Sequence, residues 1–323
     1  MQIRHFNMNF PLPFFFFCRF FLDVSIIIPI FATSNQLTMS KFINPFTDVG
    51  FKIIFGQEFS KPRLLDFLNA LLEGERSITD LKFLDKEQSA FFDGDKSPIY
   101  DILCETATGE KIIVEMQNRE HPHFRERMLF YASEAIVRQG EKGNEWNYDI
   151  KAVYMVAFTN FVQKDYAGCL RIDAKLIDNE GNLFSDKMRL IFLQMPCFTK
   201  EADECENHFE RWIYILKNME ILERMPWAAQ NAVFQRLAEV AEVSKLSKED
   251  RLAYDHALKR YRDTLNSLRG AKEEGRAEGR AEGRAEGIEE TKRDNARRMK
   301  TDGMSSELIA KYTGLTIEQI NSL

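Results

Sequence analysis

The sequence predicts an α/β protein with a mixed sheet, continued by a helical C-terminal extension. Two apolar runs, residues 99–104 and 112–116, flank a turn that contains Gly109, which is typical of a β-hairpin. Residues 150–161 are apolar almost without interruption, as expected for a strand buried on both faces. Residues 61–72 carry leucines at helical spacing. The first part of the chain therefore combines strands with helices.

Two helices and a short strand are predicted before the hairpin. Residues 44–56 place Asp48 and Lys52 four positions apart, and so on one side if this segment is helical. Residues 61–72 form a core helix whose apolar side consists of Leu64, Leu65, Leu68, Leu71 and Leu72. Residues 78–84 have the composition of a short strand.

The turn of the hairpin sets which residues face each other. A three-residue loop, Ala107-Thr108-Gly109, puts Gly109 where the backbone is left-handed, which glycine adopts without steric penalty. Asp101 then lies opposite Glu115, with β-carbons roughly 5 Å apart. Gln117 lies on the same face because side chains alternate along a strand.

Two carboxylates that face each other in a hairpin repel. A hard divalent cation bound by both of them makes their proximity favourable. Mg²⁺ binds through one or two carboxylates and keeps several waters, which phosphate oxygens can replace. The alternative is a solvated face on which Asp101, Glu115 and Gln117 point at water. A glycine bulge that shifts the register by one residue would also separate the two acids. The geometry alone leaves these possibilities open.

A helix and three strands are predicted around and after the hairpin. Residues 123–139 form a helix whose apolar side contains Phe124, Met128, Tyr131, Ala132, Ala135 and Ile136. The buried strand of residues 150–161 follows. Residues 170–177 and 188–195, joined by the turn 178–182, extend the sheet. From residue 200 onward the pattern is helical, over residues 205–219, 228–246 and 248–268.

Residues 274–287 repeat Glu-Gly-Arg-Ala with period four. In a helix this repeat stacks glutamate over glutamate and forms no Glu–Arg pair at i, i+3 or i, i+4. Each glycine also costs about 1 kcal/mol relative to alanine. The segment is predicted to be a solvated spacer, flexible or marginally helical. The alternative is a self-association seam in which the small residues allow close approach.

The C-terminal end resembles a helix-turn-helix. Basic residues gather over residues 292–300, Gly314 is a helix stop, and Thr316 and Gln319 have the spacing of a capping box. DNA binding is one interpretation, because basic residues contact phosphates and a helix enters a groove. A docking or oligomerisation module is the other, because residues 305–323 contain a single basic residue, Lys311.

Composition places further bounds on function. The 323 residues carry a formal net charge of −6, so any contact with nucleic acid is expected to be local. The five cysteines include no Cys-x-x-Cys, which supports neither a zinc knuckle nor a disulfide framework. They fit a reducing cytoplasm, and no stable membrane partner is expected.

Residues 1–38 form an apolar leader that differs from the rest of the chain. Arg19 and Asp23 interrupt it, which disfavours a transmembrane helix. Small residues near Ala32 are compatible with signal-peptide cleavage, but export would be unusual for a protein with free cysteines. We expect translation to begin at Met39, which leads directly into the segment containing Asp48.

Asp101 followed by Glu115-Met116-Gln117 resembles the signature of the PD-(D/E)XK nuclease superfamily. More narrowly, the chain resembles the family of recombination-promoting nucleases and transposases. Asp48 with Phe51-Lys52 is similar to that family's opening motif, and Arg127 with Tyr131 is similar to its Arg-x-x-x-Tyr. The predicted order αβββαβ is that of the superfamily core.

The resemblance implies metal-dependent hydrolysis of DNA phosphodiester bonds, linked to recombination or to transposition of mobile elements. Asp101 and Glu115 would hold Mg²⁺, with Mn²⁺ as a possible substitute, assisted by the Met116 carbonyl. Gln117 replaces the lysine that is frequent at its position, so it can hydrogen-bond a water but supplies no charge. The alternative is a catalytically inactive DNA-binding or scaffolding protein with a nuclease-like core.

Further residues have supporting roles on the same resemblance. Asp48 either joins the metal site or caps a helix, and Glu58 and Asp66 are weaker competitors for the first role. Lys52, Arg127 and Tyr131 are candidate supporting residues. The expected organisation is the leader 1–38, a nuclease-like domain 39–199, a helical extension 200–270, a spacer 271–291 and a helix-turn-helix-like segment 292–323. DNA is the expected partner, and a homo-oligomer is possible.

Overall fold

The computed structural model describes residues 40–87, 99–141, 143 and 145–323. The predicted leader, residues 1–38, lies outside the described residues. The structure therefore does not bear on whether it is a transmembrane helix, a signal peptide or a segment upstream of a translation start at Met39. None of the helices in the described ranges combines the length and the apolar composition needed to cross a bilayer.

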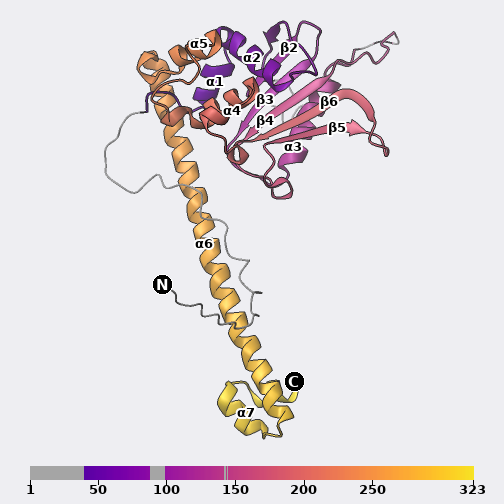
Figure 1. Ribbon diagram of the computed structural model, residues 1–323. Helices are drawn as coiled ribbons and strands as arrows, with labels where there is room; N and C mark the ends of the chain where they lie inside the picture. The colour runs from indigo at the N-terminus through magenta and orange to yellow at the C-terminus, as the bar shows by residue number, and fades with distance from the viewer. Residues whose placement is uncertain (1–39, 88–98, 142, 144) are drawn as a thin grey trace, which may run out of the picture. The chain divides into compact units, whose positions relative to one another are not determined.

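A six-stranded mixed sheet with the order β1-β2-β3-β4-β6-β5 forms the centre of the fold (Figure 1). The strands are β1 (Leu81–Phe83), β2 (Ile102–Thr106), β3 (Lys111–Gln117), β4 (Val153–Thr159), β5 (Arg171–Ile177) and β6 (Leu183–Gln194). β4 runs parallel to β3 on one side and to β6 on the other, while the remaining neighbours are antiparallel. Every residue of β4 is buried, as the uninterrupted apolar run predicts.

The β2–β3 hairpin has the predicted register. Gly109 has a φ of 90°, and its N–H donates to the Thr106 carbonyl at 3.0 Å. Ile102 pairs with Val114, and this register continues to Asp101 opposite Glu115. The register shift that would have separated the two acids does not occur.

Helices cover both faces of the sheet (Figure 1). On one face lie α1 (Asp48–Phe55), α2 (Lys61–Leu71), α4 (His208–Asn218) and α5 (Ala232–Ala241), and on the other lies α3 (Phe124–Val137). Side chains of one strand alternate between the two cores: Ile112 and Val114 pack with the first group, and Ile113 packs with α3. The helices predicted over residues 44–56, 61–72, 123–139, 205–219 and 228–246 are confirmed with shorter bounds, and the order αβββαβ is observed.

The C-terminal helices share the core of the nuclease-like part. Trp212 of α4, Phe234 of α5 and Tyr254 of α6 are buried in the same cluster as Phe55 of α1. The Tyr254 hydroxyl accepts a 2.8 Å hydrogen bond from the Asn44 N–H. The predicted helical extension is therefore packed against the sheet-bearing part of the chain.

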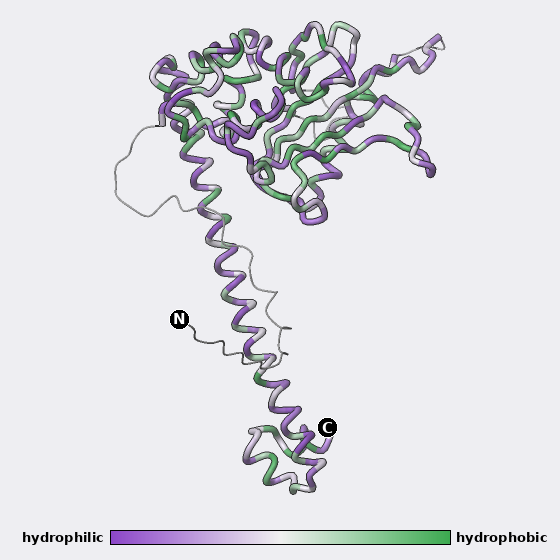
Figure 2. The backbone as a smooth tube through the Cα atoms, viewed as in Figure 1, coloured by the Kyte–Doolittle hydropathy of each residue, from purple (hydrophilic) through white to green (hydrophobic). Residues whose placement is uncertain are grey.

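α6 (Lys248–Thr301) is one helix of 54 residues and contains the whole Glu-Gly-Arg-Ala repeat. Figure 2 shows it as mostly hydrophilic beyond its first turns. The helix predicted for residues 248–268 thus continues further than its apolar spacing indicates. Packing anchors both ends of α6, and Glu, Arg and Ala are good helix formers, which offsets the glycines.

α7 (Ser306–Thr313) and α8 (Ile317–Asn321) pack against the end of α6. Their small core consists of Ala296, Ile309, Leu315 and Ile320. Gly314 ends α7 with a φ of 72°, and the predicted capping box between Thr316 and Gln319 is present. The short-helix geometry expected for this end is confirmed.

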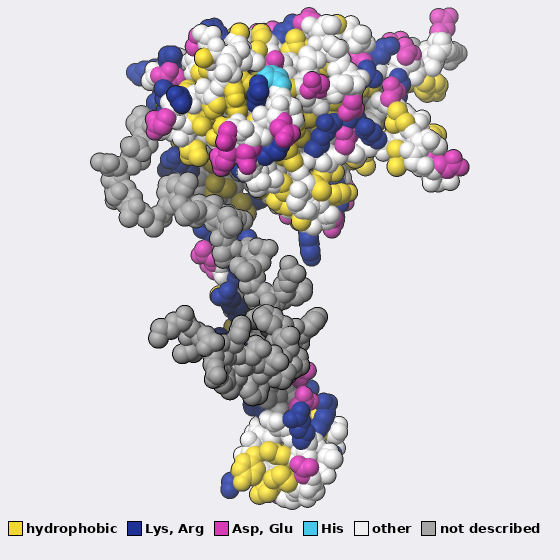
Figure 3. Space-filling model, in the orientation of Figure 1, with side chains coloured by type: hydrophobic (Ala, Val, Ile, Leu, Met, Phe, Trp, Pro, Cys, Tyr) yellow, Lys and Arg dark blue, Asp and Glu magenta, His cyan; other side chains and the backbone are white. Residues whose placement is uncertain are grey.

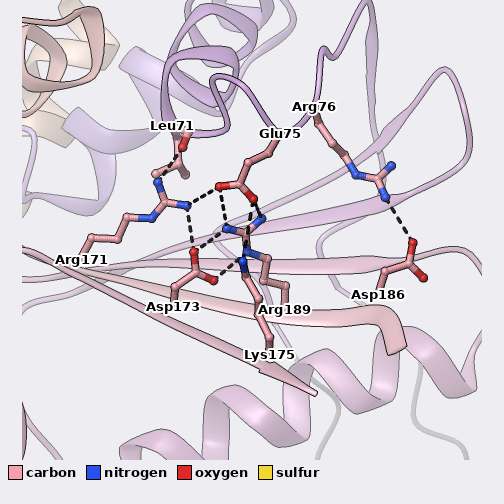
Figure 4. Close-up of polar contacts among 8 residues, drawn as sticks. All are labelled: Leu71, Glu75, Arg76, Arg171, Asp173, Lys175, Asp186 and Arg189. Carbon is pink, nitrogen blue, oxygen red and sulfur yellow. Dashed lines mark hydrogen bonds and ion pairs between the residues drawn. The ribbon is translucent and has the colours of Figure 1, made fainter. Parts of the chain in front are cut away.

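A charged network ties the loop after α2 to the last two strands (Figure 4). Arg189 on β6 donates to Asp173 Oδ1 at 2.7 Å and to Glu75 Oε2 at 2.6 Å. Arg171 on β5 donates to Asp173 Oδ2 at 2.9 Å and to the Leu71 carbonyl at 2.9 Å. The Arg189 side chain is 9% exposed, against 23% for Asp173 and 41% for Glu75. Arg189 is therefore the buried centre of the network.

We predict that Arg189→Met lowers the free energy of unfolding by about 1–3 kcal/mol. Removing one partner of a buried pair costs about 3–5 kcal/mol, and the partial exposure of both carboxylates reduces this cost. Urea unfolding at pH 7 measures the change. Lys187→Met on the same strand is the matched control, because Lys187 is 42% exposed and its only ion pair among the described residues is with Asp186 at 3.6 Å. The control should stay within about 0.5 kcal/mol of the natural chain.

The same variant has a defined pH dependence. Hydrogen bonds from Arg189 lower the pKa of Glu75. Burial raises the pKa of Asp173, but the hydrogen bonds and charge of Arg189, together with the charges of Arg171 and Lys175, outweigh burial and lower it. A carboxyl group whose folded pKa is lowered contributes stability above its unfolded pKa and loses it as the pH falls through the folded pKa. The difference between Arg189→Met and the natural chain should therefore shrink below about pH 4. An equal difference at pH 3 and pH 7 would contradict an electrostatic role for Arg189.

Candidate active site

Asp101 and Glu115 are held together at the end of the β2–β3 hairpin. Asp101 immediately precedes β2, and its backbone N–H donates to Glu115 Oε1 at 3.1 Å. In the other direction, the Met116 N–H on β3 donates to Asp101 Oδ2 at 2.9 Å. Each carboxylate is thus positioned by the backbone of the neighbouring strand. Glu115 is only 3% exposed.

The two carboxylates strongly affect each other's ionisation. Burial, followed by the negative charge of Asp101, raises the pKa of Glu115 to about 8. Burial also raises the pKa of Asp101, with a contribution from Asp48, against the opposing effects of the Met116 N–H and Lys52. Two acids in a poorly solvated place cannot both ionise cheaply without a cation. The site therefore favours bound positive charge.

Gln117 connects this pair to α3. Its Nε2 donates to Glu115 Oε2 at 3.3 Å, and its Oε1 accepts from Arg127 Nη2 at 2.6 Å. Arg127 Nε is buried and has no hydrogen-bond partner among the described residues. Tyr131, one turn further along α3, lies close enough for Glu115 to act on it: burial and then the charge of Glu115 raise the pKa of the Tyr131 hydroxyl. The structure brings all five residues of the predicted hairpin and helix motifs together.

α1 brings two more predicted residues toward the site. Asp48 and Lys52 both act electrostatically on the Asp101 carboxylate. Thr47, not Asp48, is the helix cap, because its side chain accepts from the Gly50 N–H at 3.0 Å. The capping interpretation of Asp48 is therefore wrong, since the polar residue before it already caps the helix. Asp48 is exposed in the first turn.

The weaker acidic candidates lie elsewhere or point away. Asp66 accepts hydrogen bonds from Trp212 Nε1 at 2.7 Å and His208 Nε2 at 2.6 Å, so its carboxylate joins α2 to α4. Glu58 is exposed in a short 3-10 turn after α1. Arg125, near the start of α3, donates to Gln163 and Asp165, away from the paired acids.

Two residues near the site were not found from the sequence. Lys86, in the loop after β1, lowers the pKa of Asp101 by its charge. Asn118, directly after β3, donates from Nδ2 to the Phe46 carbonyl at 2.7 Å, and its buried Oδ1 has no partner in the described part of the chain. Lys86 lies in a polar stretch with no periodic signal. Asn118 could have been noticed only as the residue after Gln117.

Over the described part of the chain, no three His, Cys, Asp or Glu side chains gather as a metal site. His121 and His123 therefore belong to no such group. A metal at the paired acids would rest on two protein carboxylates. Mg²⁺ accepts such a donor set, because waters and substrate phosphate oxygens complete its coordination.

A mixed sheet carrying two acids and a glutamine on its central hairpin, between helices, defines a fold of the PD-(D/E)XK type. The model of the PD-(D/E)XK nuclease family transposases matches residues 45–271, and the chain belongs to that family. No curated protein and no solved structure matches the chain. The matched range contains all the site residues above and most of the helices that share their core.

We predict that Glu115→Gln stabilises the metal-free protein at pH 8. An acid whose folded pKa is raised makes the fold most stable below its unfolded pKa, about 4.3, and less stable as the pH rises toward the folded pKa. Neutralising Glu115 should therefore add roughly 1–3 kcal/mol to the free energy of unfolding at pH 8 and little at pH 4. Urea unfolding in EDTA at both pH values measures this. A variant that is less stable at pH 8 would show that Glu115 is needed for the fold.

Proposed function

We propose that the chain is a metal-dependent DNA endonuclease that hydrolyses phosphodiester bonds, in keeping with the nuclease and transposition role of its family. The observation that carries the proposal is the buried pair Asp101 and Glu115, held by reciprocal backbone hydrogen bonds. Burial raises the pKa values of both acids, and such a pair is costly for a purely structural hairpin. The cost is explained if the pair binds a cation.

Asp101 and Glu115 would hold Mg²⁺, with Mn²⁺ as a substitute, assisted by the Met116 carbonyl. The bound metal would lower the pKa of a water and offset the charge that develops on the phosphoryl group. The hydrogen bonds from the Asp101 and Met116 N–H groups fix the two carboxylates before any ligand binds. Such preorganisation reduces the ordering that binding requires.

Gln117 is suited to orient a water beside the pair. One amide proton goes to Glu115 and one lone pair of Oε1 accepts from Arg127. An amide carries two donor hydrogens and two acceptor lone pairs, so one of each is left for a water. Arg127 provides, from α3, the positive charge that a lysine at position 117 would have carried.

The remaining cations around the site supply a local contact for the DNA backbone. Lys52 and Lys86 act on Asp101, and Arg127 acts on Glu115. Elsewhere the charge is mixed: on the face in Figure 3, basic and acidic side chains are interspersed. With a net charge of −6, the chain is expected to bind DNA through this local group.

The test is cleavage of supercoiled plasmid with Mg²⁺, Mn²⁺ or EDTA. We expect metal-dependent nicking or linearisation, reduced at least about a hundredfold in Asp101→Asn and in Glu115→Gln, because each change removes a charged metal ligand. Glu58→Gln is the matched control, since it neutralises an exposed acid whose charge is not among the main influences on the pKa of Asp101 or Glu115. Circular dichroism of each variant verifies that it is folded.

A natural chain as inactive as its variants, but still able to bind the plasmid, would overturn the catalytic proposal. The chain would then be a DNA-binding or scaffolding protein with a nuclease-like core. Equal cleavage by the natural chain and both variants would place the activity outside this pair or in a contaminant.

We further predict that Gln117→Lys lowers cleavage about tenfold instead of raising it. The lysine ammonium would lie beside the Arg127 guanidinium and could not accept its hydrogen bond. Replacing Arg127 as well, in Gln117→Lys with Arg127→Gln, should recover part of the loss, because coupled residues show non-additive effects of about 0.5–3 kcal/mol. Initial rates for the two single variants and the double variant complete this cycle. Additive losses would show that the two side chains act independently.

A further inference from the structure

The middle of α6 presents a long face that the described chain leaves uncovered. Every residue from 271 to 288 is exposed. Among the ion pairs of the described residues, none includes an arginine or glutamate from this stretch. Its charges are thus without partners in the ion-pair network of the folded chain.

On the helix surface these charges form two rows, one of arginines and one of glutamates, which we call the arginine rank and the glutamate rank. Each arginine directly follows a glycine and each glutamate directly precedes one, so at about 100° per residue the two charges lie on opposite flanks of a row of glycines. The arginine rank is Arg276, Arg280 and Arg284; the glutamate rank is Glu274, Glu278, Glu282 and Glu286; the row between them is Gly275, Gly279, Gly283 and Gly287. Within one helix the neighbours at i, i+4 therefore have like charge and repel.

This arrangement is complementary to itself in one orientation. When two parallel copies face each other through the glycine row, a two-fold rotation brings the arginine rank of each copy against the glutamate rank of the other, on both flanks. In an antiparallel pair the rotation brings arginine against arginine and glutamate against glutamate. Charge complementarity therefore selects a parallel pair.

Towards the C-terminal end of α6, the same face contains a groove that is lined by both apolar and polar side chains. Gly283 and Gly287 line a groove of about 520 Å³ together with Ile288 of α6 and Tyr312 of α7. Ile288 is 53% exposed and Tyr312 is 64% exposed. A β-carbon added at any glycine of the row would meet open space, so no contact within the described chain requires glycine there.

We propose that α6 pairs in parallel with α6 of a second copy of this chain through the glycine row, with the arginine rank of each copy against the glutamate rank of the other. The glycines allow the two backbones to approach closely. Because a period of four exceeds 3.6 residues per turn, the row drifts around the helix and the two helices cross with right-handed geometry. Pairing brings two catalytic cores into one assembly, and it can be measured without reference to DNA cleavage.

The first test is the mass of the full chain in solution by sedimentation equilibrium. We expect a dimer, and a dissociation constant raised more than about tenfold in Gly279→Leu with Gly283→Leu, because the added side chains separate the helices. Ala277→Leu with Ala281→Leu is the matched control: it adds the same side chains on the opposite face of α6 and should leave the dimer intact. Circular dichroism verifies that both variants keep the helix.

The second test determines orientation. A swapped variant exchanges the ranks: Arg276→Glu, Arg280→Glu and Arg284→Glu, with Glu274→Arg, Glu278→Arg, Glu282→Arg and Glu286→Arg. In a parallel pair the swapped chain should dimerise with itself as well as the natural chain does. Mixed dimers of the two should be rare, because their facing ranks have like charge. Native mass spectrometry of the mixture, with one chain mass-labelled, counts the three species.

Three outcomes would overturn the proposal. A chain that remains monomeric at tens of micromolar has no such pair. A dimer that survives the two glycine substitutions unchanged uses another surface. A predominance of mixed dimers over the two homodimers would show that the helices are antiparallel. None of these outcomes bears on whether the Asp101 and Glu115 site cleaves DNA.

Discussion

The reciprocal hydrogen bonds between Asp101 and the Glu115-Met116 segment are the constraint on which the site depends. Each carboxylate is held by an N–H of the opposite strand, so neither can move without disturbing the hairpin. The three-residue turn at Gly109 keeps the register, and a slip of one residue would turn Glu115 to the other face. The backbone thus holds the two buried acids close together, although their negative charges repel each other.

Around this pair the fold supplies charge of the opposite sign from three separate segments. Lys52 comes from α1, Lys86 from the loop after β1 and Arg127 from α3. Only the packing of helices on both faces of the sheet can bring them together, since they lie far apart in the sequence. A chain with a net charge of −6 can therefore still present a cationic environment to one phosphate group.

Local patterns predicted the features whose causes are local. The turn at Gly109 determined the hairpin register, the apolar run determined the fully buried β4, and the capping box at Thr316 identified the start of α8. Features that depend on distant contacts were missed. Lys86 has no periodic signal, and the helical state of the Glu-Gly-Arg-Ala repeat depends on packing at both ends of α6. The capping role given to Asp48 failed because Thr47, one residue earlier, forms the cap.

The position of Arg127 explains why glutamine is better suited than lysine to position 117. Arg127 reaches Gln117 from α3, and its Nη2 needs an acceptor that a lysine cannot provide. With arginine there, a lysine at position 117 would place two cations together in a poorly solvated place. A glutamine instead accepts a hydrogen bond from Arg127 and donates one to Glu115, so it links the guanidinium to the two acids. The positive charge that a lysine would supply at position 117 is thereby moved to α3, while the hydrogen-bonding position on β3 is kept.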